Sequence, residues 1–329
     1  MKRRNFLSLG AITAAVAAKP VVATATTPDK SIKMPSADRV HVGGSKRIEI
    51  GGGHWVWTKK VGSGNTKVLL LHGGPGADHR YFEGFEDFLP MNDIEFYYYD
   101  QLDSSNSDKP DDPKLWTIER YTDEVEAVRQ GLGLEQFYLL GHSWGGVLAI
   151  EYALKYQQHL KGLVISNMAA SADSVVKHVT KIRAQFPEDI RTELERYENA
   201  GKTSDPAYQK LLFDKLYTVF ICRLDPWPDP VQRSLGGWNQ HIYNVLQGRS
   251  EFEVTGRMKD WDRWADLPKI KIRTLTMGAR YDEMDPEDMR KMATLMPKGE
   301  SWISETGSHF AMYDDQQNYF RALLTFLKA

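Results

Sequence analysis

Short apolar runs alternate with longer amphipathic segments through most of this chain of 329 residues. Four apolar runs have the length and composition of buried strands: 67–71, 94–99, 136–140 and 160–166. Helical patterns at 118–132 and 145–156 separate the last three of these runs. Strands that alternate with helices predict a mostly parallel sheet flanked by helices on both faces. Ahead of them, 47–50 and 54–59 are separated by three glycines and predict a hairpin.

The alternation stops after Met168 and resumes near residue 265. The segment 169–264 is helical in pattern, charged and rich in tryptophan, without strand-like runs. Beyond it, strands are expected at 274–277 and 301–304, and helices at 286–296 and 316–327. We interpret 43–168 and 265–329 as one core, and 169–264 as a helical cap inserted before the penultimate strand.

The first residues have the pattern of an export signal. Lys2, Arg3 and Arg4 precede an apolar stretch at 6–18, and Ala23-Thr24-Ala25 is a plausible cleavage site. The paired arginines suggest a twin-arginine signal peptide over 1–25, followed by a linker over 26–42. The alternative is a membrane anchor, but the apolar stretch is short for a bilayer. We therefore expect an exported protein, periplasmic or secreted, with no stable membrane anchor after cleavage.

Composition excludes several function classes. The chain has 42 Lys and Arg against 44 Asp and Glu, a net charge of −2, and no basic stripe, so no nucleic-acid partner is predicted. Cys222 is the only cysteine, which rules out an intramolecular disulfide and a cysteine-ligated metal cluster. No His-Glu-x-x-His run is present, and we expect neither a metal nor a cofactor.

The motif Gly141-His142-Ser143-Trp144-Gly145 lies between a strand-like run and a helical one. In that context G-x-S-x-G is typical of the α/β-hydrolase fold, in which a strained turn exposes a nucleophilic serine. Side chains at Gly141 and Gly145 would clash where the backbones converge. We therefore predict an α/β-hydrolase with Ser143 as its nucleophile.

A glycine-rich loop at 72–76 follows the strand-like run 67–71. In this fold the corresponding loop provides one oxyanion donor, and the residue after the nucleophile provides the other. We assign these donors to the backbone N–H groups of Gly74 and Trp144.

The base and its acid should follow the serine in the order Ser, acid, His. His309 lies in a loop of small residues between the last strand and the last helix. Asp282 follows the penultimate strand and would orient the imidazole of His309. Glu283, Asp285 and Asp288 are the rival acids.

Matching stretches in core and cap resemble the proline iminopeptidases, and within that family the likeness is greatest to the tricorn-interacting aminopeptidases. The stretches are 72–76, 99–101, 141–146, 161–163, 250–252, 255–256, 259–262 and 281–283. The resemblance implies a serine exopeptidase that releases an N-terminal residue, often proline, from short peptides. It also implies that Glu251 and Glu283 bind the free α-ammonium of the substrate. The family's glycine-rich turn after Asp-Gln is replaced here by residues 102–107, which puts the fit of the substrate in question.

Two alternatives remain open at this point. An amino-acid amidase or small-ester hydrolase would use the same triad. A non-catalytic exported binding protein on a hydrolase scaffold is the rival from another class, although all three triad positions are occupied. A dehalogenase or epoxide hydrolase is disfavoured, because those members of the fold have a carboxylate where Ser143 stands.

Overall fold

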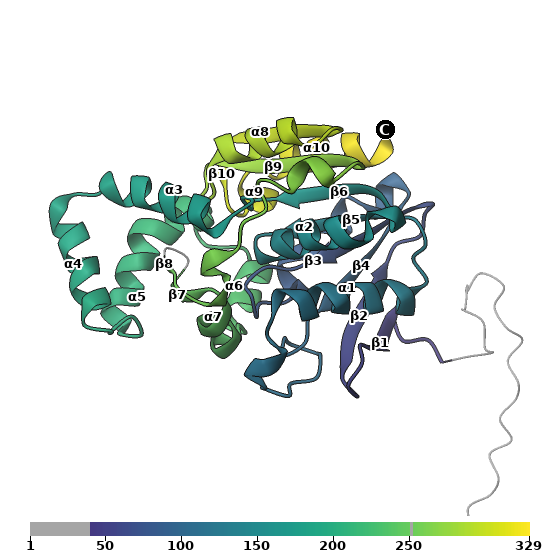
Figure 1. Ribbon diagram of the computed structural model, residues 1–329, viewed down its shortest axis with the longest axis horizontal. Coiled ribbons are helices and arrows are strands. Elements are labelled where there is room, and N and C mark those ends of the chain that lie inside the picture. Colours follow the sequence, from purple (N-terminus) through teal and green to yellow (C-terminus); the bar gives the residue numbers. More distant parts are fainter. Residues whose placement is uncertain (1–39, 251–252) are drawn as a thin grey trace, which may run out of the picture. The chain divides into compact units, whose positions relative to one another are not determined.

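An eight-stranded sheet forms the centre of the computed structural model, which describes residues 40–250 and 253–329 (Figure 1). The strands are β1 (Ser45–Glu49), β2 (Trp55–Val61), β3 (Thr66–Leu71), β4 (Ile94–Asp100), β5 (Phe137–His142), β6 (Leu160–Ser166), β9 (Arg273–Tyr281) and β10 (Gly299–Ser308). Their order is β1-β2-β4-β3-β5-β6-β9-β10. β1 and β2 form the predicted antiparallel hairpin, β2 is antiparallel to β4, and all other pairs are parallel. The predicted, mostly parallel sheet is confirmed.

Helices cover both faces of this sheet. The main ones are α1 (Ile118–Leu132), α2 (Trp144–Tyr156), α8 (Pro286–Leu295) and α10 (Gln316–Lys328). Alternate residues of β3 enter separate cores: Leu69 belongs to the core that includes residues of α1, α2 and α8, whereas Leu70 belongs to the core that includes residues of α10 and the 3₁₀ helix His79–Asp87. This two-residue period is the reason that strands buried on both faces appear in the sequence as continuous apolar runs.

The chain between β6 and β9 is mostly helical and gathers on the left of the sheet in Figure 1. It contains α3 (Ala172–Ala184), α4 (Glu188–Asn199), α5 (Pro206–Leu212), a π-helix (Phe213–Ile221), α6 (Asp229–Gly236) and α7 (Gln240–Leu246). The prediction that this segment lacks strands is wrong: β7 (Gly248–Ser250) and β8 (Glu253–Val254) form a two-stranded antiparallel sheet. Strands of two and three residues are too short to show an alternating pattern in a sequence.

The predicted signal peptide at 1–25, and the linker at 26–42 except its last residues, lie outside the described part of the chain. Within the described part, no helix combines the length and the hydropathy that crossing a membrane requires.

Candidate active site

Ser143 occupies the turn between β5 and α2, as predicted. Its backbone has φ 56° and ψ −129°, a conformation that residues with a side chain adopt rarely. A Cβ atom at Gly141 would lie 2.0 Å from the carbonyl oxygen of Gly145, and one at Gly145 would lie 2.0 Å from that of Leu71. The two glycines are therefore required for the backbones to converge, and the strained turn that they permit presents the Ser143 hydroxyl at the carboxyl end of β5.

Gly74 and Trp144, the predicted oxyanion donors, adjoin the same small space as Ser143. Trp144 is the first residue of α2, so its N–H has no acceptor within the helix. Gly74 has φ 117°, which a residue with a side chain would not tolerate. The Trp144 indole donates to Gln101 (2.8 Å), and the Gln101 amide donates to the carbonyl of His72 (2.8 Å). Gln101 thereby ties the serine turn to the glycine loop.

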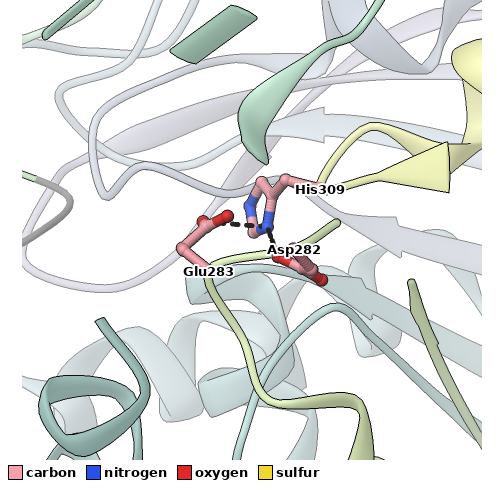
Figure 2. Close-up of side chains that lie close together, drawn as sticks. All are labelled: Asp282, Glu283 and His309. Atoms are coloured by element: carbon pink, nitrogen blue, oxygen red, sulfur yellow. Dashed lines mark hydrogen bonds and ion pairs between the residues drawn. The ribbon is translucent and has the colours of Figure 1, made fainter. Parts of the chain in front are cut away.

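His309 and Asp282 meet as the sequence predicts: Nδ1 of the imidazole lies 2.9 Å from Oδ1 of the carboxylate (Figure 2). Asp282 also accepts hydrogen bonds from the Asn167 amide (2.6 Å) and the Met284 backbone N–H (3.1 Å). Burial alone would raise the pKa of Asp282, but His309 first, and then hydrogen bonds from Glu283 and Asn167, outweigh it and hold the pKa below its usual value. Asp282 is thus a buried anion placed to orient the base.

The other candidate acids have different surroundings. Asp285 caps α8 by accepting from the Glu287 N–H (3.0 Å) and pairs with His178 (3.1 Å). Asp288 lies within α8, where burial raises its pKa. Of the four acidic residues considered, only Asp282 and Glu283 approach His309 in the described structure.

Glu283 lies against the imidazole of His309, with Oε1 2.9 Å from Nδ1 (Figure 2). The residue is fully buried, and neither carboxylate oxygen accepts an aligned hydrogen bond from any residue that the structure describes. Burial, reinforced by the charge of Asp282, raises the pKa of Glu283 well above its usual value. Burial would lower the pKa of His309, but Glu283 and then Asp282 raise it well above the usual value. The Glu283–His309 pair therefore holds one proton tightly.

Glu251, the partner expected for Glu283, lies outside the described residues. Its neighbour Ser250 lines the cavity over Ser143. Asp282, Glu283 and His309 also have ligand atoms within 4.8 Å of one another, close enough for a metal ion. Because Nδ1 of His309 already faces Asp282, we interpret the three residues as an acid–base group.

A cavity of about 290 Å³ lies over the serine turn, and both Ser143 and His309 line it. The cap contributes most of its wall: Phe213, Tyr217, Trp227, Trp238 and Tyr243. No Asp, Glu, Lys or Arg of the described chain lines it. A second space of about 10 Å³ adjoins Ser143, Gly74 and Trp144 and is lined by Met168, Met258 and Met284. The site therefore combines the predicted nucleophile, base and oxyanion donors with apolar surroundings.

Known proteins match both the sequence and this architecture. The family model described as the alpha/beta hydrolase fold matches residues 66–316. A proline iminopeptidase of Elizabethkingia meningoseptica is 46% identical over 278 residues, covering 83% of this chain and 93% of the relative. One of Flavobacterium johnsoniae is 45% identical over 276 residues, with the same coverage. This chain belongs to the proline iminopeptidase family.

A solved structure of a protein of the same name also matches this chain. The crystal structure of a proline iminopeptidase from Mycobacterium smegmatis superposes with a TM-score of 0.80 at 27% identity, covering 86% of this chain and 97% of that one. Family and fold together make the protein a hydrolase. The closer likeness to the tricorn-interacting aminopeptidases stays a prediction.

Several residues that support the site were not predicted from the sequence. Asn167 has φ 54° and follows β6, beside the strand that carries Ser143. An asparagine at the carboxyl end of a strand next to the nucleophile's strand was the available signal. The unusual turn at 102–107 is built without glycine: Asp103 (φ 66°) and Ser105 (φ 29°) adopt the left-handed conformation. Asp103 is held there by accepting from the Trp116 indole (2.9 Å).

Proposed function

We propose that the protein is a serine aminopeptidase that releases an N-terminal residue, proline or another small apolar residue, from short peptides. The observation that carries the proposal is the pairing of His309 with Asp282 beside the Ser143 turn, in a cavity lined by both Ser143 and His309. Relatives that are 45–46% identical and named proline iminopeptidase support the substrate class.

The proposed chemistry proceeds through an acyl-enzyme. His309 takes the proton of Ser143, whose oxygen attacks the scissile carbonyl, and the N–H groups of Gly74 and Trp144 stabilise the oxyanion. Each such donor contributes about 3 kcal/mol to the transition state. His309 then returns the proton to the leaving amine. Water repeats the sequence on the acyl group and frees Ser143.

Glu283 is the feature that favours a substrate with a free N-terminus. A buried carboxylate without a hydrogen-bond donor is costly as an anion, and an ammonium group would stabilise it. Arrival of that cation would also release the proton that Glu283 and His309 hold between them, leaving His309 neutral and able to act as the base. Glu251, which follows the cavity-lining Ser250 in the chain, is proposed as the second carboxylate at the ammonium group.

Matched substrates test this proposal. Prolyl and alanyl arylamides with a free N-terminus should be cleaved, whereas their N-acetylated forms should be cleaved at least about 100-fold less efficiently, since the site's carboxylates would lose their ionic partner. Equal turnover of acetylated substrates would contradict the aminopeptidase assignment and favour a general amidase or esterase. Export remains a separate proposal, and the size and location of the mature protein in the native cell test it.

A further inference from the structure

Two buried side chains that have no role in the chemistry above connect the oxyanion loop to the base. The N–H of Gly73 donates to the Tyr81 hydroxyl (2.5 Å), which lies 3.2 Å from Nδ1 of His142. Nε2 of His142 in turn lies 2.9 Å from the backbone carbonyl oxygen of His309. Tyr81 and His142 are each 1% exposed. A continuous line of polar contacts therefore passes beside Ser143, from the loop before Gly74 to the base.

The chemistry of these groups fixes where each proton lies. A carbonyl oxygen only accepts, so Nε2 of His142 must carry a proton. Burial, aided by the nearby His309, lowers the pKa of His142 to about 3, so its ring is neutral and Nδ1 is an acceptor. The Tyr81 hydroxyl accepts from Gly73 and gives its own proton to that Nδ1. In this arrangement every donor in the line has one acceptor.

The carbonyl held by His142 belongs to a residue that is fixed from the other side as well. The N–H of His309 donates to the Phe220 carbonyl (3.0 Å), in the π-helix of the cap. The His142 and His309 rings lie 4.7 Å apart between centroids. A neutral ring at 142 does not repel the imidazolium that forms on His309 during catalysis, whereas a cationic ring would.

We propose that Tyr81 and His142 are positioning residues that act as one relay: they hold the Gly73–Gly74 loop and His309 in register with Ser143. The inference rests on the proposed function, because it takes Ser143 to be the nucleophile. The competing explanation is that the two side chains only satisfy each other's polar groups in the core. Unlike that structural explanation, the relay requires that substitution of Tyr81 and substitution of His142 have the same consequence for catalysis.

The test measures how fast a fluorophosphonate acylates Ser143 at several reagent concentrations, which separates the maximal rate from half-saturation. The set is wild type, Tyr81→Phe, His142→Leu, the double variant and His142→Gln. Each of the first two substitutions should lower the maximal rate about 10-fold with unchanged half-saturation. The double variant should be no slower than the slower single variant, because either change breaks the relay. His142→Gln should stay within about 3-fold of wild type, because its amide N–H replaces the donor to His309.

Other outcomes overturn the relay. Losses that multiply in the double variant would mean that Tyr81 and His142 act independently. Wild-type rates in both single variants would mean a structural role alone, and so would a glutamine variant as slow as the leucine variant. Melting temperatures report folding, and His142→Asn, whose shorter amide does not reach His309, replaces the leucine variant if that one does not fold. If wild type is not labelled, the proposed function fails and the relay with it, whereas a labelled wild type with unaffected variants removes the relay alone.

Discussion

Asp282 and Glu283 are consecutive in the chain, and each places a carboxylate oxygen 2.9 Å from the same nitrogen of His309. That nitrogen has one proton to donate, so the two carboxylates differ in role. Asp282 also accepts from Asn167 and Met284, and its pKa is lowered. Glu283 has no aligned donor, and its pKa is raised. In the proposed mechanism Asp282 therefore orients the base, and Glu283 is available to a cation.

Asp282→Asn tests the orienting role. An amide would present its N–H to the imidazole and favour the wrong tautomer of His309, so kcat should fall about 10⁴-fold with little change in KM. Asp285→Asn is the matched control three residues away, because asparagine also caps a helix well, and its kcat should stay near wild type. A similar loss in both variants would contradict the assignment of Asp282.

Glu283→Gln tests recognition of the ammonium group. The neutral amide keeps the shape of the side chain but cannot balance a buried cation, so kcat/KM for free N-terminal substrates should fall about 100-fold. The kcat/KM for a small neutral ester should fall far less. The ratio of the two kcat/KM values, which measures the preference for a free N-terminus, should therefore decrease. Glu287→Gln, exposed on α8, is the control and should behave as wild type. Equal losses on ester and peptide substrates would make Glu283 part of the general machinery instead.

The pH dependence of kcat/KM follows from the environment of His309. Burial opposes the charged imidazole, but Glu283 and Asp282 outweigh it, so the pKa of His309 lies well above 6.5. Activity on a neutral ester should therefore rise with pH through a pKa above 6.5. Glu283→Gln removes the larger of the two raising influences, and the acid limb should move to lower pH. An acid limb at the same pH in the variant and in wild type would show that Glu283 does not affect the pKa of His309.

The same pKa values predict a change in stability. The pKa values of His309 and Glu283 are both raised in the folded chain, so the proton that the pair holds stabilises the folded chain at low pH. This stabilisation is lost as pH rises through the raised values, by about 1.4 kcal/mol for each unit of raised pKa. The free energy of unfolding of Glu283→Gln minus that of wild type, measured with denaturant, should therefore be larger near pH 9 than near pH 5. The opposite trend would contradict the raised pKa of Glu283.

Asn167 is the supporting residue with the clearest test. Its amide donates to Asp282 (2.6 Å) and its Oδ1 accepts from the Ser166 hydroxyl (2.7 Å), while its backbone has φ 54°, so Asn167→Ala loses these hydrogen bonds and strains the chain. Asn167→Gly loses the hydrogen bonds without the strain, since glycine tolerates a positive φ. Both variants should lower kcat about 10-fold, but only the alanine variant should lose a further 1 kcal/mol or so of stability. Full activity in the glycine variant would mean that the bond to Asp282 is not needed.

Much of this site is visible in the sequence because its parts lie at the ends of strands and helices. Gly141 and Gly145 identify the serine turn in the sequence. The runs that form β5 and α2 predict the strand before the turn and the helix after it. His309 and Asp282 follow from chain order in the fold. These features depend on local pattern and on the short list of places where a sheet of this kind can carry function.

The other features of the site depend on contacts between segments that are distant in the sequence. Asn167 meets Asp282 across 115 positions, and His142 meets His309 across 167. The position of Asn167 after a strand was a signal for a role at this edge of the sheet, but the local sequence of neither residue identifies its partner. Glu283 was named as a rival acid from its position in the chain, and its role at the ammonium group was expected only from family resemblance. Its position against the imidazole required the structure. The strands β7 and β8 were not predicted because three and two residues are too few to show an apolar alternation.

The most direct test of the account is the intact mass of the protein after exposure to a fluorophosphonate, with the adduct located by peptide mapping. We expect one adduct per chain on Ser143, none in Ser143→Ala, and strongly slowed formation in His309→Ala. Labelling that persists in Ser143→Ala, or a folded wild-type protein that takes up no adduct, would contradict it.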